Sequence, residues 1–138
     1  MDDAVPLVWN PFAAVASEKT VKNQPFYRRL KFAYSGLIVA LRGENSFRTH
    51  ALAAVAVVGV LIWRRPAALW WATILVTMMV VLATELINTA VEHLADHLHP
   101  DQHPQIKVVK DCAAAAVLIA SIGAVGVAIA FAIDQWRS

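Results

Sequence analysis

Charged residues and cysteines are scarce in this chain of 138 residues. Only 16% of the residues are charged, whereas a soluble domain of this size carries about a quarter. The single cysteine, Cys112, excludes an internal disulfide and any CxxC metal or redox motif. The net charge of +2 leaves no basic stripe for nucleic acid. Apolar residues make up 59% of the chain and the mean hydropathy is +0.55, so much of the surface must face lipid instead of water.

Common motifs of nucleotide-binding and hydrolytic enzymes are also missing. There is no GxxxxGK(S/T) phosphate loop, no GxGxxG loop and no GxSxG nucleophile elbow. Glu85 and Glu92 are not followed by His three residues later, which excludes the Glu-x-x-His pattern of a di-iron site. His93 and His97 have the i, i+4 spacing of metal ligands, but without an evident third ligand we interpret them as interfacial residues.

The start of the chain has little in common with a secretory signal. Met1 to Asp3 is acidic where a signal peptide is basic, and residues 4–24 contain no long apolar run. We interpret residues 1–24 as a loosely ordered cytoplasmic extension of a membrane domain that covers residues 25–138.

Long apolar stretches dominate the rest of the sequence. Residues 67–91 and 112–133 are long enough to cross a hydrocarbon core about 30 Å thick. Residues 51–63 form a shorter stretch, which crosses the core if its helix begins near Phe47. The sequence therefore predicts an all-α membrane protein with three transmembrane helices, at about 47–63, 67–96 and 107–135.

Residues 26–41 form an amphipathic pattern ahead of these stretches. Apolar residues recur on one helical face, and the basic residues Arg28, Arg29 and Lys31 lie mostly elsewhere. Such helices lie in the membrane surface, where basic residues meet anionic headgroups. We therefore predict an N-terminal amphipathic surface helix at about 26–42.

Positive charges and tryptophans predict the orientation. With the N-terminus inside, nine Lys and Arg residues lie on the cytoplasmic side and three, Arg64, Arg65 and Arg137, lie outside. Four tryptophans fall at the outer interface, where an aromatic belt is expected: Trp63, Trp70, Trp71 and Trp136. We therefore expect a multi-pass protein of the bacterial inner membrane, with its N-terminus in the cytoplasm and its C-terminus outside.

One transmembrane stretch carries a polar stripe near its cytoplasmic end. Glu85, Asn88, Glu92 and Asp96 fall within about 80° of one another on a helix that turns 100° per residue. A carboxylate at the bilayer centre costs roughly 2.5–3.5 kcal/mol on insertion scales, so an acidic residue inside such a run indicates function. Glu85 lies deepest in the apolar run, and Asp96 is the member best explained as an ordinary interfacial residue.

The residue types of this stripe suit Mg²⁺ and phosphate. Mg²⁺ is commonly held by one or two carboxylates together with substrate phosphates. Glu44, Lys110 and Asp111 are predicted on the same side of the membrane, and a lysine can neutralise phosphate charge during transfer. These observations predict phosphoryl transfer at the cytoplasmic surface.

Two non-enzymatic functions are alternatives to this prediction. A cation-conducting protein needs polar residues across the bilayer, but the outer halves of the last two spans offer only Thr73 and Thr77. A scaffold subunit of a larger membrane complex gives no reason for Lys110 and Asp111 to face the stripe. Both alternatives predict no phosphorylation by the isolated protein.

The run from Glu85 to Asp96, ELINTAVEHLAD, followed by Lys110-Asp111 at the start of the next apolar helix, resembles the prokaryotic diacylglycerol kinase family, which includes undecaprenol kinases. The similarity extends upstream through residues 42–48 to Gly36 and covers about residues 26–136. It implies a homotrimeric lipid kinase that uses ATP and Mg²⁺, with an active site shared between neighbouring subunits at the cytoplasmic surface.

The resemblance also implies a role for each matching residue. Glu85 matches the catalytic base, Glu44 and Glu92 match metal-coordinating carboxylates, and Asn88 and Asp96 match other polar residues of the active site. The nucleotide-binding residues that it implies are Lys110, Asp111, Glu92, Arg28 and Arg29.

Some positions differ from the family pattern, and others indicate which lipid is the substrate. Pro25 stands where members often carry a basic residue, for which Arg28 or Arg29 could substitute, and Phe32 lacks the hydroxyl of the aromatic residue found there in some members. The link from His97 to Pro104 and the Glu92-His93 pair resemble the undecaprenol-kinase branch. We therefore expect undecaprenol as the substrate, with diacylglycerol as the alternative.

Overall fold

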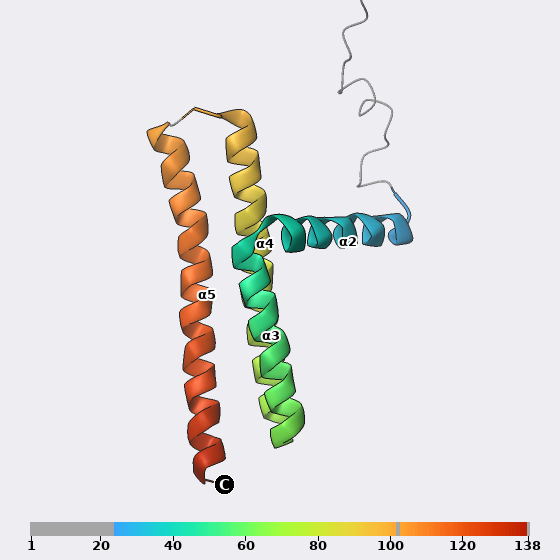
Figure 1. The fold of residues 1–138 in the computed structure, drawn as a ribbon, viewed down its shortest axis with the longest axis vertical. Coiled ribbons are helices and arrows are strands. Elements are labelled where there is room, and N and C mark those ends of the chain that lie inside the picture. The colour runs from blue at the N-terminus through green and yellow to red at the C-terminus, as the bar shows by residue number, and fades with distance from the viewer. Residues whose placement is uncertain (1–23, 102, 138) are drawn as a thin grey trace, which may run out of the picture. The chain divides into compact units, whose positions relative to one another are not determined.

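The computed structural model describes residues 24–101 and 103–137, and these residues form helices joined by short links without any strand. The helices are α2 (Phe26–Gly43), α3 (Asn45–Arg64), α4 (Ala68–Leu98) and α5 (Pro104–Arg137) (Figure 1). Three of them, α3, α4 and α5, are long and apolar enough to cross a membrane. The prediction of an all-α membrane fold is therefore confirmed, and α4 and α5 extend beyond the predicted ends of their spans.

The chain forms two compact units, and the boundary between them lies between Gly36 and Leu37. The described part of the first unit comprises Gln24, Pro25 and the N-terminal portion of α2, where Ser35 Oγ donates a hydrogen bond to the Lys31 carbonyl. The proposed extension 1–24 lies, apart from Gln24, outside the described residues.

The second unit contains the last turns of α2 and the helices α3, α4 and α5. Helix α4 packs mainly against α5 and less extensively against α3. Phe47 and Leu61 of α3 are fully buried, and Val117 is the only buried residue of α5. Most apolar side chains of these helices are exposed, which suits helices that face lipid or further protein.

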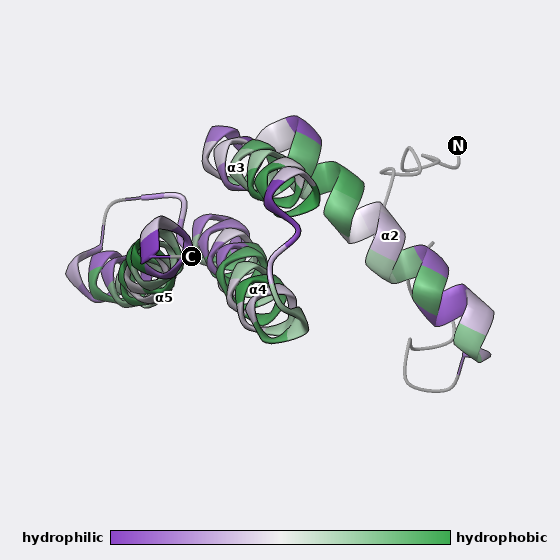
Figure 2. Ribbon diagram, turned by 90° about the horizontal axis from the view of Figure 1, so that it is seen from below, coloured by the Kyte–Doolittle hydropathy of each residue, from purple (hydrophilic) through white to green (hydrophobic). Residues whose placement is uncertain are grey.

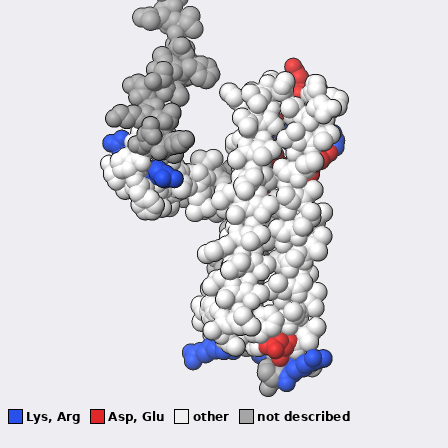
Figure 3. Space-filling view, turned by 180° about the vertical axis from the view of Figure 1, so that it is seen from behind, with Lys and Arg blue, Asp and Glu red and all other residues white. Residues whose placement is uncertain are grey.

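Charged residues lie at the two ends of this helical unit. Figure 3 shows them gathered at the ends, with an uncharged band between, and Figure 2 shows apolar residues along the helices and polar ones in the α3–α4 link. Arg65 ends α3 in the left-handed conformation, with φ of 48°, and its N–H donates to the Leu61 carbonyl. Pro66 follows and disfavours continuation of the helix.

A polar and aromatic cluster joins α4 to α5 at the end opposite the α4–α5 link. Trp70 Nε1 donates to Asp134 Oδ2 over 2.8 Å, and the Trp70 ring meets Phe131 edge-on with centroids 5.4 Å apart. Arg64 donates to the Gln135 carbonyl over 3.1 Å. These contacts tie the α3–α4 link to the end of α5 and so fix how α4 and α5 pair along their length.

Candidate functional site

The predicted polar stripe on α4 is present and becomes more exposed toward the α4–α5 link. Glu85 is buried, with 3% of its surface exposed, whereas Asn88 and Glu92 are half-buried and Asp96 is exposed. No described residue hydrogen-bonds or pairs with the Glu85 carboxylate. A buried carboxylate without a partner is unfavourable, which leaves a structural role unsupported.

Asn88 and Glu92 contact each other one helical turn apart. Asn88 Nδ2 donates to Glu92 Oε1 over 3.0 Å, which fixes the orientation of the amide. The other amide atom, Asn88 Oδ1, is then buried and has no hydrogen-bond partner among the described residues. Buried acceptors are normally satisfied, so this oxygen is a candidate to bind a ligand or a water held by one.

Glu44 reaches the stripe from another segment. It is the N-cap residue of α3, and its Oε1 lies 3.2 Å from His93 Nε2 on α4. The contact brings Glu44 to the segment of α4 that carries the stripe, because His93 directly follows Glu92 in the sequence. The interpretation of His93 as only an interfacial residue missed this contact.

The lysines near the start of α5 are paired with carboxylates. Lys110 Nζ lies 2.5 Å from Asp96 Oδ1 on α4, and Lys107 Nζ lies 2.5 Å from Asp111 Oδ2 one turn along α5. Asp96, which is exposed, thus pairs with the predicted phosphate-binding lysine at the end of the stripe, and its role in the site stays a prediction.

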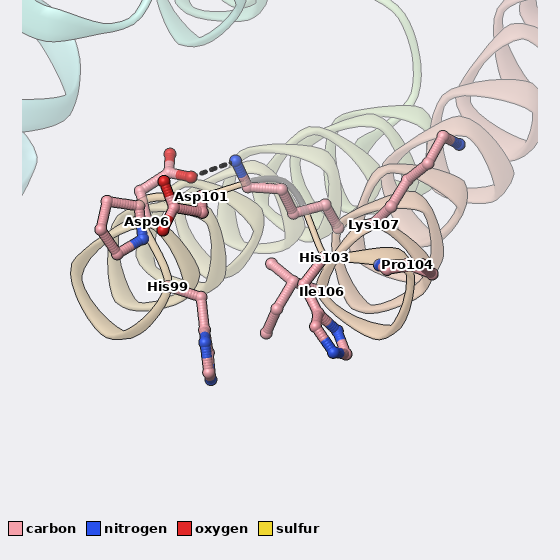
Figure 4. A pocket seen from close by; sticks show the side chains of 9 residues that line it. Asp96, His99, Asp101, His103, Pro104, Ile106 and Lys107 are labelled. Carbon is pink, nitrogen blue, oxygen red and sulfur yellow. Dashed lines mark hydrogen bonds and ion pairs between the residues drawn. The ribbon is translucent and has the colours of Figure 1, made fainter.

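A hollow of about 560 Å³ lies beside the Asp96–Lys110 pair at the α4–α5 link. Figure 4 shows the link histidines His99 and His103 projecting to the same side of it, while Lys107 extends away. The hollow is lined by charged groups of both signs, with Asp96 and Asp101 as well as Lys107 and Lys110, so it suits a polar ligand.

Arg28 and Arg29 belong to the first unit and are described there alone. Arg28 donates to the Gln24 side chain over 3.2 Å and to the Tyr27 hydroxyl over 3.3 Å. These contacts leave the proposed nucleotide role of the two arginines a prediction.

The residues fit a hard, oxygen-seeking cation only in combination with a substrate. The described residues contain no group of three or more His, Cys, Asp or Glu side chains able to hold a metal. Mg²⁺ needs fewer protein ligands when phosphates complete its shell, and the oxygens of Glu44, Glu92 and Asn88 are of the required type. A resident metal held by this chain alone does not fit, whereas Mg²⁺ that arrives with a nucleotide does.

An apolar groove of about 430 Å³ is lined by residues of α2, α3 and α4. Its lining includes Leu41, Phe47, Met78 and Leu82. Met78 and Leu82 precede Glu85 by seven and three residues, so they share its face of α4. Sequence patterns alone did not predict this groove, because it depends on how the end of α2, α3 and α4 pack.

Fold and site together define an α-helical membrane protein with a buried acidic residue on a helix face that runs from an apolar groove to a polar, charged end. Residues 31–132 match the model of the family described as prokaryotic diacylglycerol kinase. The chain belongs to this family, whose members are lipid kinases and therefore phosphotransferases.

Named relatives include kinases with different lipid substrates. A diacylglycerol kinase from Synechocystis sp. is 35% identical over 96 residues, which cover 69% of this chain and 55% of that protein. An undecaprenol kinase from Bacillus subtilis is 33% identical over 99 residues, or 70% and 79% of the two chains. A diacylglycerol kinase from Escherichia coli is 31% identical over 94 residues, or 68% and 77%. This chain thus spans about half the length of the Synechocystis relative and more of the other two.

Proposed function

We propose that this protein transfers the γ-phosphate of ATP to the hydroxyl of a membrane lipid alcohol, with undecaprenol as the favoured substrate. The observation that carries the proposal is the buried Glu85, whose carboxylate has no partner among the described residues. Its face of α4 continues to the groove residues Met78 and Leu82 on one side and to the polar residues of the stripe on the other. A lipid alcohol needs this combination, because its chain is apolar and its reacting oxygen is polar.

Glu85 acts as the general base in this proposal. The lipid chain lies along the groove lined by Met78 and Leu82, which directs its hydroxyl toward Glu85. The hydroxyl oxygen attacks the γ-phosphorus as the bond to ADP breaks, and Glu85 accepts the hydroxyl proton. A carboxylate suits this task when it lies within hydrogen-bond reach of the hydroxyl whose proton it accepts.

The polar end binds the nucleotide. Lys110 neutralises phosphate charge, and Asp111 together with Arg28 or Arg29 completes the nucleotide site. Asp96 holds Lys110 in place through the 2.5 Å contact. Glu44 and Glu92, with the Asn88 oxygen, would hold the Mg²⁺ that arrives with ATP. When bound, Mg²⁺ supplies charge neutralisation and orientation of the phosphates.

The assembly and the orientation are also proposals. We propose a homotrimer in the bacterial inner membrane with the N-terminus and the active site on the cytoplasmic side. The exposed surface of α5, with the small residues Gly123 and Gly126, supports assembly, because small residues allow helices to approach closely. Native mass spectrometry should give three times the 15.1 kDa of one chain, and a monomeric enzyme with full activity would contradict the trimer.

The similarity of the link histidines to the undecaprenol-kinase branch favours undecaprenol. The 35% identity to a protein named diacylglycerol kinase supports the second candidate substrate. Purified protein in mixed micelles with labelled ATP should phosphorylate undecaprenol faster than diacylglycerol at equal mole fraction. The reverse order would replace the favoured substrate, and no phosphorylation of either lipid would contradict the proposed function.

A further inference from the structure

Glu44 is an unusual residue to begin a helix. Ser, Thr, Asp and Asn are preferred at the N-cap because their short side chains accept hydrogen bonds from the first turn. Glu44 has the extended N-cap backbone, with φ of −109° and ψ of 117°, but its side chain makes no capping hydrogen bond. The start of α3 therefore does not explain the choice of Glu at this position.

The backbone of Glu44 is fixed while its side chain is directed elsewhere. Its N–H donates to the Ala40 carbonyl over 2.9 Å, and its carbonyl accepts from the Arg48 N–H over 3.2 Å. The carboxylate instead meets His93 Nε2 across the helix pair, at 3.2 Å. This is the only polar contact of the Glu44 side chain within the part of the chain that the structure describes.

His93 makes no other polar contact with the described residues. Its side chain is 59% exposed, so its removal leaves no cavity, and that of Glu44 is 31% exposed. The contact needs only a neutral imidazole with its proton on Nε2. On α4 it repeats the relation of Asn88 to Glu92, in which a neutral donor holds a carboxylate at 3.0 Å.

We infer that His93 is a positioning residue that holds Glu44 against the segment of α4 that carries Glu92, so that the divalent cation of the nucleotide can bind both carboxylates. The inference rests on the proposed function, in which both carboxylates serve that cation. Groups that orient a metal ligand by hydrogen bonding typically change metal affinity about 10- to 100-fold when they are removed.

The test compares His93→Ala, His93→Gln and His97→Ala in full-length protein in nanodiscs. Gln can place an amide N–H near the position of Nε2, whereas Ala cannot. His97 lies one turn further along α4, is exposed, and makes no interaction with another described residue, so its variant is the matched control. Binding of the Mn²⁺ complex of a non-hydrolysable ATP analogue is followed by electron paramagnetic resonance, and far-UV circular dichroism checks the fold of each variant.

We expect His93→Ala to weaken binding of the Mn²⁺ complex about 10-fold, with His93→Gln restoring most of it and His97→Ala matching the wild type. In turnover assays, His93→Ala should raise the Mg²⁺ concentration for half-maximal rate more than it lowers kcat. Wild-type affinity in folded His93→Ala, or Gln as weak as Ala, would overturn the positioning role. The binding comparison gives a result even if neither lipid is phosphorylated, so failure of the proposed function is recognised separately.

Discussion

At the scale of single residues, burial separates members of the stripe that the sequence treats alike. Glu85, Glu92 and Asp96 have the same charge and share one helical face, but the structure buries the first and exposes the last. We propose chemistry at Glu85 because it is buried without a partner among the described residues, and a holding role for Asp96 because it pairs with Lys110. The residues are thus distinguished by their surroundings more than by their type.

Asn88 should matter through the hydrogen bond that it donates to Glu92. Replacing Asn88 with Ala removes this donor and the free oxygen, and we expect kcat/KM for ATP to fall about 10- to 100-fold. Thr84→Ala is the control, because the Thr84 hydroxyl bonds only to the Val80 carbonyl of its own helix. Equal activity of the two variants in the micelle assay would show that Asn88 does not orient Glu92.

Substitutions of Lys110 and Asp96 should differ in their effect on KM for ATP, although the two residues form one ion pair. Lys110→Met removes the positive charge that the proposal assigns to phosphate, so we expect a large rise in KM for ATP. Asp96→Asn keeps that charge and loses only a holding contact, so its rise should be several-fold smaller. The pair is largely exposed, and thermal stability should change by less than about 1 kcal/mol in both variants. A larger defect in Asp96→Asn than in Lys110→Met would contradict these roles.

At the scale of helices, side-chain contacts join α4 and α5 at both ends of the pair. The Asp96–Lys110 contact joins them near their link, and Trp70 with Asp134 joins them at the far end. These two contacts hold the stripe of α4 in position relative to the first turns of α5.

The hydrogen bond between Trp70 and Asp134 should contribute to the stability of the fold and not to the rate of catalysis. Asp134→Ala removes the acceptor of the Trp70 N–H, and we expect a loss of about 1 kcal/mol in unfolding free energy, since such a hydrogen bond is worth that much. Turnover at low temperature should stay near the wild-type rate. Trp63→Phe provides the control, because Trp63 is 78% exposed and only its ring meets Arg64. Thermal unfolding in detergent compares the two variants. An equal loss of unfolding free energy in both would show that the Trp70–Asp134 hydrogen bond does not stabilise the pair of helices.

The helices could be predicted from the sequence, but their contacts could not. Apolar length and the turn at residues 43–45 predict three spanning helices, because a membrane admits few other structures. The contact of Glu44 with His93 depends on the packing of α3 against α4, which periodicity does not specify. The same holds for the apolar groove and for the partner of Asp96, while the stripe itself follows from spacing on one helix.

At the scale of the whole molecule, charge at both ends and an apolar band between them describe a protein built to cross a bilayer (Figure 3). The low burial of α5 means that one chain does not satisfy its own apolar surface within the described residues. Lipid covers that surface, and further subunits cover part of it in the proposed trimer.

The proposed orientation gives a labelling pattern. In a Cys112→Ala background, a cysteine in place of Arg137 should react with a membrane-impermeant maleimide added outside spheroplasts. A cysteine in place of Asp101, in the α4–α5 link, should react only after the membrane is opened. The opposite pattern would place the active site outside, away from cytoplasmic ATP, and would contradict the orientation.

The most direct test of the central claim is the rate of Glu85→Gln with saturating ATP, Mg²⁺ and lipid. Gln keeps the size of the side chain but cannot accept the hydroxyl proton, and the loss of a general base costs about 10²- to 10⁴-fold. We therefore expect kcat to fall by at least about 100-fold while the fold and the affinity for ATP are kept. Near-normal turnover in a folded Glu85→Gln protein would contradict the assignment of Glu85 as the base.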